Sequence, residues 1–244
     1  MSDFKNISHD LIKNLELKYE AVGVTLFQKG DALPEGISFA AGNFKSYCQA
    51  LVLSGEGQTL LLKKEQMGCK LGTAVLGFEK GRELEAYVDD GIMEKYGVGL
   101  FASEEAAAAT ILKAPYLKRG KTQAVLIAPL SAFAGQPQVV VFTADSEQVM
   151  WLLYAANYET GGPMALPQSG GALGGCADIT ALPLLKGVSN ITFLGLGCRI
   201  KTGLDPCHLM MGLPGQVLAS VHTHILDMAK PITMLTKARA GGAK

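Results

Sequence analysis

The sequence predicts an α+β fold, α/β in the broader sense, in which a mixed β-sheet packs against helices. Apolar segments of strand length, TQAVLIA at 122–128 and QVVVFT at 138–143, alternate with segments that carry helix-capping residues. The chain has 244 residues and is 48% hydrophobic, which is enough to bury a core. Because no repeat and no clear linker divides it, we expect a single domain over residues 1–244, with a frayed basic tail from about residue 237.

The first third of the chain predicts one short helix and three apolar segments. Residues 9–18 favour a helix, because Leu11, Leu15 and Leu17 recur among polar neighbours. YEAVGVTLF at 19–27 and QTLLLK at 58–63 are typical of strands. YCQALVL at 47–53 is short enough to be a strand or a buried helix, and both remain open.

The middle of the chain predicts helices at 80–95, 103–113 and 145–158. Ser103 is a good N-cap, with two glutamates in the first turn where the helix dipole favours them. Asp145 and Gln148 have the spacing of a capping box. The body of that last helix, VMWLLYAAN, is apolar nearly all round, so we expect it to be buried.

Glycine and proline interrupt the last third of the chain. Residues 161–175 hold six glycines and two prolines, which argue against a regular element. We expect a short helix at 177–185 and a strand at 189–196 that ends in Gly197-Cys198-Arg199. A helix is expected at 214–228, with Pro214 in its first turn.

Composition and charge narrow the classes of function. Lys and Arg number 22, as do Asp and Glu, so the balanced charge gives no electrostatic case for nucleic acid or for a membrane surface. The polar start of the chain lacks the apolar core of a secretory signal. No stretch reaches the roughly 18 apolar residues of a membrane span. We therefore expect a cytoplasmic protein.

Familiar nucleotide, hydrolase and histidine motifs are weak or absent. Residues 97–102, GVGLFA, fit the G-x-G-x-x-A pattern of dinucleotide sites, but the preceding segment does not read as the strand that this motif requires. There is no phosphate-binding P-loop and no G-x-S-x-G turn. His222 and His224 could bind a metal from a strand, but in a helix residues two apart diverge, so a packing role is favoured.

The cysteines carry the strongest chemical signal. An odd number, five, in a chain without a secretory signal argues against a disulfide framework. An iron–sulfur cluster needs four converging thiolates, and neighbouring glycines let backbone N–H groups approach it. Lys70 and Arg199 would offset its negative charge. Spacing alone leaves buried free thiols as the plain alternative. The four candidates, each beside glycine or at the end of an apolar segment, are Cys48, Cys69, Cys176 and Cys198.

The order of these segments resembles the domain of unknown function 169 family. The likeness rests on YCQA, MGCKLG, GGCA and GCR around the cysteines, on VGVTLF, and on TQAVLIAPL followed by QVVVFTADSEQVMWLLYAA. It runs roughly from Leu15 to Val221. The family is found widely in anaerobic bacteria and archaea. The resemblance implies a shared fold and matches the four candidate cysteines to recurring family cysteines. It has no counterpart for Cys207, which we treat as a non-ligand, and it implies no reaction.

We therefore expect a metal-binding protein that holds one 4Fe–4S cluster through Cys48, Cys69, Cys176 and Cys198, with the 161–175 loop closing over it. Its role would be electron transfer with a redox partner, or redox or Lewis-acid chemistry on a small molecule. Whether it is an enzyme or a homo-oligomer is open.

Two alternatives use the same residues differently. A structural zinc ion could bind the four thiolates, although the short C-x-x-C motifs that such sites usually use are absent. A small-molecule-binding protein without metal could line its pocket with polar residues such as Tyr158, Thr160 and Arg199.

Overall fold

A six-stranded antiparallel sheet forms the centre of the described residues. The structure is a computed structural model that describes residues 3–81, 85–86, 88, 100–167 and 172–242. The strand order is β2-β3-β1-β4-β6-β5. The α+β class is confirmed, but the named strands do not form a mixed sheet, because they all pair antiparallel. Parallel pairing is limited to two isolated bridges. The strands are β1 (Val22–Gln28), β2 (Leu60–Leu62), β3 (Thr122–Pro129), β4 (Val139–Asp145), β5 (Asn190–Thr192) and β6 (His208–Pro214).

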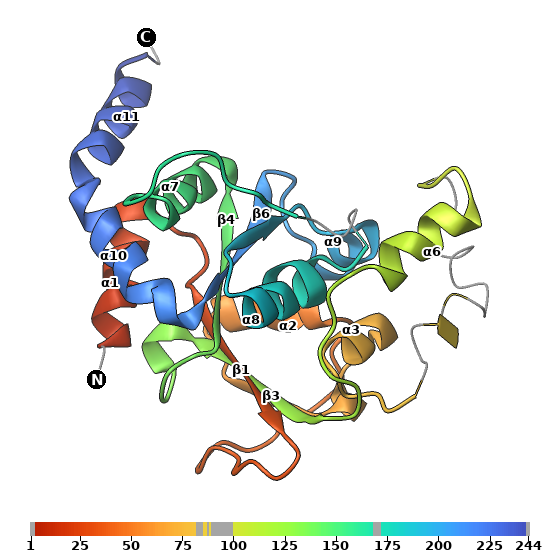
Figure 1. Cartoon of the computed structure of the whole chain (residues 1–244). Coiled ribbons are helices and arrows are strands. Elements are labelled where there is room, and N and C mark those ends of the chain that lie inside the picture. The colour runs from red at the N-terminus through yellow and green to blue at the C-terminus, as the bar shows by residue number, and fades with distance from the viewer. Residues whose placement is uncertain (1–2, 82–84, 87, 89–99, 168–171, 243–244) are drawn as a thin grey trace.

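Helices cover both faces of this sheet (Figure 1). Short helical turns, η1 (Lys64–Gln66), η2 (Leu130–Ala132) and η4 (Gly215–Val217), connect the larger elements, and η3 (Gly174–Ala181) is a π-helix. The α-helices are α1 (Phe4–Leu15), α2 (Tyr47–Gly55), α3 (Lys70–Val75), α6 (Glu104–Leu112), α7 (Ser146–Ala156), α8 (Leu182–Lys186), α9 (Leu196–Thr202), α10 (Leu218–Asp227) and α11 (Ala229–Gly242).

Alternate residues of the strands enter two different cores. Val139 and Val141 of β4 join a first core with α2, α3, α6 and η3. Val140 and Phe142 of the same strand join a second core with α1, α7 and α10. A strand buried on both faces needs apolar side chains at nearly every position. This is why TQAVLIA and QVVVFT are continuous apolar runs and show no alternation.

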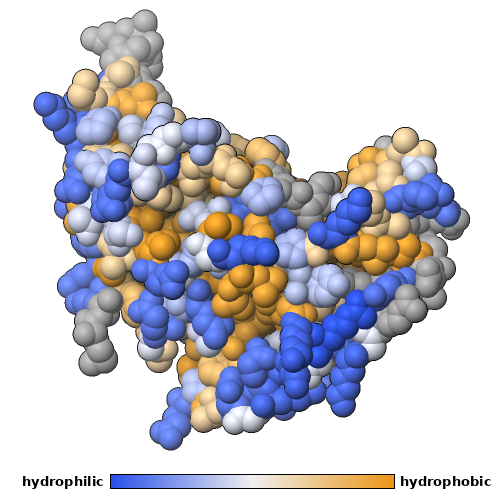
Figure 2. Space-filling model, viewed as in Figure 1, coloured by the Kyte–Doolittle hydropathy of each residue, from blue (hydrophilic) through white to orange (hydrophobic). Residues whose placement is uncertain are grey.

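The predicted helix caps are present. Ser103 accepts a hydrogen bond from the Ala106 N–H, and Asp145 with Gln148 forms the capping box of α7. The expectation that α7 is buried holds for the side that carries Val149, Trp151, Leu152 and Ala155, whereas Tyr154 on the other side is 56% exposed. Apolar surface also gathers over α6 and α8 (Figure 2), where Leu112 and Leu185 are exposed.

Strand β6 was not predicted, and it replaces the expected start of a helix at residue 214. The helix begins later, at Leu218, and α11 continues through residues 237–242, where we expected a frayed tail. Gly212 in the middle of β6 disfavours a strand by propensity. Glycine is needed at this position because of tertiary packing, since a Cβ on Gly212 would overlap the Ile179 carbonyl of η3. Close packing of the π-helix on the sheet therefore requires glycine there.

Two expectations concern residues that the structure does not describe, and a third concerns membrane spans. Most of the helix expected at 80–95, and the G-x-G-x-x-A motif through residue 99, fall where the structure is not described. Among the residues that are described, no helix is both long and apolar enough to span a bilayer.

Candidate metal centre

Four cysteines from four separate segments lie together on the first-core face of the sheet. Cys48 is in the first turn of α2, Cys69 is the N-cap of α3, and Cys176 is the third residue of η3. Cys198 is the third residue of α9, not part of a strand end as expected. Cys48 and Cys176 are buried, and the other two are half-buried. The structure thus brings the four candidate cysteines together, and all are free thiols.

The four thiols interact with one another electrostatically in every one of their six pairings. Cys48 Sγ lies 2.9 Å from Cys198 Sγ and donates a hydrogen bond to it. This bond, and then burial, raises the pKa of Cys48 well above its ordinary value. Accepting the same bond, with Lys201 nearby, lowers the pKa of Cys198. Cys198 is therefore the thiol of the four that most readily becomes a thiolate.

Burial governs the other two thiols. It raises the pKa of Cys69 and raises the pKa of Cys176 well above the ordinary value. The charged form is disfavoured because these sulfurs are removed from water. A bound cation would reverse this balance, since metal ligation deprotonates thiols. The four sulfurs are a donor set suited to a soft metal.

Glycine N–H groups point at the sulfurs. The Gly72 N–H donates to Cys69 Sγ at 3.4 Å. The N–H groups of Gly175 and Gly195 donate to Cys198. A Cβ on Gly175 would stand only 2.6 Å from the Cys48 sulfur, so this close approach requires glycine. Such N–H groups stabilise thiolates and the sulfides of a cluster.

The π-helix η3 supplies one of the cysteines and a buried polar network. Tyr47 Oη lies 3.1 Å from Thr180 Oγ1, and Thr180 donates to the Gly175 carbonyl at 2.8 Å. These contacts join α2 to η3 beside the thiols. Gly174 and Gly175 thus begin a helix, and they do not belong to an irregular loop that closes over the site. Single π-helical turns occur frequently at functional sites.

Sequence reasoning missed a buried carboxylate in the same helix. Asp178 is 1% exposed and accepts a hydrogen bond from Thr192 Oγ1 at 3.1 Å. It lies two residues after Cys176, where it contributes to raising the pKa of that thiol. The sequence offered one signal, an acidic residue within an otherwise apolar segment, GGCADITAL.

The thiols are gathered without being arranged for a single ion. Within the described part of the chain, no three His, Cys, Asp or Glu side chains already surround one point as ligands. The donor set still fits a metal centre in its chemistry, because four sulfurs meet where glycine N–H groups and Lys201 offset negative charge.

Comparison with known proteins decides the family. The model of the domain of unknown function 169 family, described as uncharacterised ArCR, matches residues 10–223. The chain belongs to this family. The match confirms the resemblance that we drew from Leu15 to Val221. No curated protein and no solved structure matches the chain.

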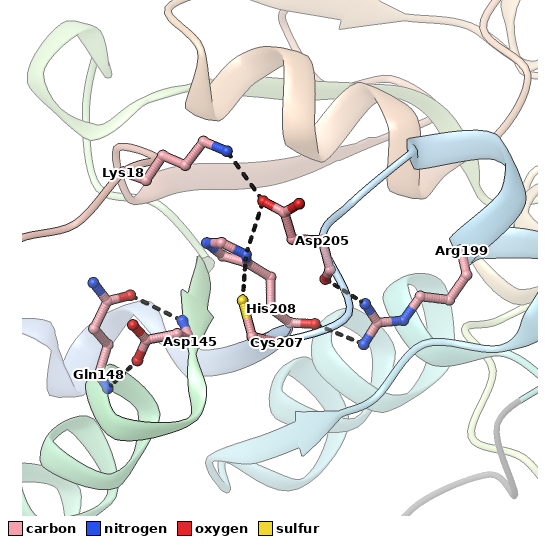
Figure 3. Close-up of polar contacts among 7 residues, drawn as sticks. All are labelled: Lys18, Asp145, Gln148, Arg199, Asp205, Cys207 and His208. Atoms are coloured by element: carbon pink, nitrogen blue, oxygen red, sulfur yellow. Dashed lines mark hydrogen bonds and ion pairs between the residues drawn. The ribbon is translucent and has the colours of Figure 1, made fainter.

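In this member of the domain of unknown function 169 family, Arg199 is a structural clamp (Figure 3). Its guanidinium donates to the carbonyl of Phe193 at 2.9 Å. It also donates to the carbonyls of Asp205 at 3.0 Å and His208 at 2.6 Å, the two contacts that Figure 3 draws. We expected Arg199 to offset the charge of a cluster. Lys201 is the cation that interacts with the thiols, and helical spacing from Cys198 could have identified it.

Cys207 lies apart from the four thiols in this family member. It is exposed, and its sulfur is 3.4 Å from Nδ1 of His208 (Figure 3). Lys18 and Asp205 form an exposed ion pair at 3.3 Å beside it. Its assignment as a non-ligand stays a prediction.

The two late histidines point in different directions from α10. His222 Nε2 lies 2.9 Å from an Asp10 carboxylate oxygen. His224 Nδ1 lies 2.8 Å from the Ala155 carbonyl, and its ring stacks on Tyr158. Both therefore have packing roles, as the helical spacing indicated.

The residues expected to line a pocket in a metal-free protein are not gathered in one. Tyr158 stacks on a histidine, Thr160 donates to the Asn157 side chain, and Arg199 binds backbone carbonyls. None of the three lines the apolar cavity beside Val149, Met150 and Tyr154 of α7.

Proposed function

We propose that Cys48, Cys69, Cys176 and Cys198 hold a 4Fe–4S cluster and that the protein acts in electron transfer or in redox chemistry on a small molecule. The observation that carries the proposal is the meeting of four thiols from four segments, with every pair close enough to interact. Cysteines kept only as small apolar residues have no reason to gather. When bound, the cluster would supply one-electron chemistry.

The local electrostatics support an anionic group at this position. Four thiolates give a cluster negative charge, and Lys201 is near two of the four sulfurs. Backbone N–H groups of Gly72, Gly175 and Gly195 already donate to sulfur. The buried faces of Cys48 and Cys176 would exclude water from the inner side, while Cys69 and Cys198 stand at the half-exposed side.

A cluster is favoured over a structural zinc ion. A tetrahedral zinc with Zn–S bonds of about 2.3 Å holds its sulfurs all about 3.8 Å apart. The described residues include no group of three or more ligands already placed around one ion. In a cubane each thiolate binds a different iron, so the ligands surround a larger object. Structural zinc sites usually draw on short C-x-x-C pairs, which this chain lacks, so a cluster is favoured.

The test is metal analysis of protein purified without oxygen. We expect about four irons and four sulfides per chain, with broad absorbance at about 400 nm. One zinc per chain without colour would replace the cluster with a structural site. Folded, reduced protein that takes up neither metal, even after chemical reconstitution with iron and sulfide, would overturn the proposal.

A serine scan assigns the ligands. Changing any one of the four candidate cysteines to serine should lower bound iron and sulfide at least two-fold, because a ligand is lost from the site. The matched control is Cys207→Ser, which removes an exposed thiol and should keep full iron content. Loss of iron in Cys207→Ser, with retention in Cys176→Ser, would contradict the assignment.

A further inference from the structure

An apolar cavity lies on the opposite face of the sheet from the thiols. Its walls include Ile191, Val149 and Leu209, which belong to the second core, whereas Cys48 and Cys176 belong to the first. The cavity has a volume of about 440 Å³ and opens to solvent. That volume is within the range of small-molecule sites.

Three segments build the apolar wall. Helix α7 contributes Met150, Leu153 and Tyr154, the following loop contributes Met164, and Phe193 follows β5. Tyr154 is 56% exposed and Phe193 is 59% exposed. Two large aromatic side chains in the lining of the cavity are thus left in water, and an apolar ligand would cover them.

The loop wall is fixed by its own hydrogen bonds. Asn157 Nδ2 donates to the Gly162 carbonyl at 2.8 Å, and Thr160 Oγ1 donates to Asn157 Oδ1 at 2.8 Å. The Gly161 N–H donates to the Asn157 carbonyl at 2.8 Å. Because these bonds occupy both side-chain polar atoms of Asn157, that residue supports the wall and leaves little polarity to the cavity. A pre-formed wall also lowers the entropic cost of binding.

The charge pattern selects an uncharged ligand. No described residue that lines the cavity is ionisable at neutral pH. Aromatic rings and methionine thioethers both favour contact with flat π-systems.

We propose that this cavity is a binding site for a flat, uncharged ring compound. The ring would lie between Tyr154 and Phe193 and contact Met150 and Met164. The proposal is independent of the cluster, because the two sites use opposite faces of the sheet and different residues.

The test compares two dyes that share a ring system. N-phenyl-1-naphthylamine is neutral, and 1-anilinonaphthalene-8-sulfonate adds one negative charge. Trp151 is the single tryptophan of the chain, and its ring lies 5.9 Å from that of Tyr154, so energy transfer from it detects bound dye, and the variants below assign the dye to this cavity. We expect saturable binding of one neutral dye per chain, at least ten-fold tighter than that of the sulfonate. Equal affinities, or no saturable binding, would overturn the proposal.

Variants locate the binding. Tyr154→Asp and Phe193→Asp each place a carboxylate on the wall and should weaken binding of the neutral dye at least ten-fold. Both residues are more than half exposed, so folding should be retained, as circular dichroism would check. They come from different elements, so either variant suffices if the other fails to fold. The matched control is Leu112→Asp on α6, an exposed leucine beyond the other face of the sheet, which should bind as the unaltered protein does. Unchanged affinity in a folded wall variant would refute the site.

Discussion

Arg199 joins helix α9 to the segments before and after it through three backbone carbonyls, two of which Figure 3 shows. These carbonyls belong to residues before and after the helix, so one side chain fixes both ends of the segment that presents Cys198. A planar guanidinium can donate in several directions at once, whereas a lysine ammonium is a compact group on a flexible stem. The identity of this residue, and not only its charge, therefore matters.

Arg199→Lys should destabilise the protein by about 1 to 3 kcal/mol, because at least one carbonyl loses a charged donor. Urea unfolding would measure this loss, and hydrogen exchange should rise over residues 193–208. The control is Lys18→Ala, which breaks the exposed pair with Asp205 and should leave the unfolding midpoint unchanged. An Arg199→Lys protein as stable as the unaltered one would show that the clamp is dispensable.

The candidate ligands could be predicted as a set, but their individual environments could not. Glycine directly before Cys69, Cys176 and Cys198 was visible in the sequence, and Gly175 is indeed required by its approach to Cys48. The difference between Cys198, with a lowered pKa, and Cys176, with a raised one, depends chiefly on the hydrogen bond that Cys198 accepts from Cys48, 150 residues away, and on the burial of Cys176. No local pattern encodes such long-range contacts.

Elements with local signals were predicted, and those with tertiary causes were not. The capping box of α7 depends on residues three apart, so the sequence located that helix. Strand β6 carries methionines and a central glycine, and its strand conformation is selected by pairing with β4 and β5. The short helix α9, which contains Cys198, was likewise missed, and Cys198 was expected at a strand end. This helix is held by the contacts of Arg199, which no local pattern indicates.

Gly212→Ala tests how tightly η3 packs on β6. The new methyl group would overlap the Ile179 carbonyl, which is backbone and cannot rotate away. We expect a loss of about 3 kcal/mol in the free energy of unfolding, measured in urea on metal-free protein. In Gly72→Ala the nearest atoms are 3.6 Å away, so this control in α3 should change stability by less than about 1 kcal/mol. Equal effects of the two changes would mean that η3 moves freely away from the sheet.

The sheet separates two sites of different chemistry in one molecule. Thiols gather in the first core and an apolar cavity opens beside the second. Strand order could not be read from the sequence, because antiparallel pairing joins segments far apart, such as β1 with β3 and β4. The class of fold followed from composition and local periodicity, while the arrangement of the sites depends on topology.

Proton binding by the buried thiols gives the whole molecule a defined dependence of stability on pH. In metal-free protein, Cys48, Cys69 and Cys176 have raised pKa values relative to the ordinary 9.0, and Cys198 has a lowered one. A thiol with a raised pKa keeps its proton in the folded state while the unfolded chain releases it. Its stabilising contribution is therefore complete below the unfolded pKa and is lost as the pH rises toward the folded value. Cys198 has the opposite effect, so as the pH rises three thiols lower the free energy of unfolding and one raises it.

We therefore expect the free energy of unfolding of metal-free, reduced protein to fall between pH 8 and pH 10. The fall should be about 1 kcal/mol per pH unit for each thiol by which those with a raised pKa outnumber the one with a lowered pKa. Urea unfolding in a phosphine reductant would measure the slope. Cys176→Ala removes one of the three opposing thiols and should reduce the slope, whereas Cys207→Ser, at the exposed thiol, should leave it unchanged. If Cys176→Ala kept the full slope, the buried thiols would not be the groups that couple proton release to unfolding.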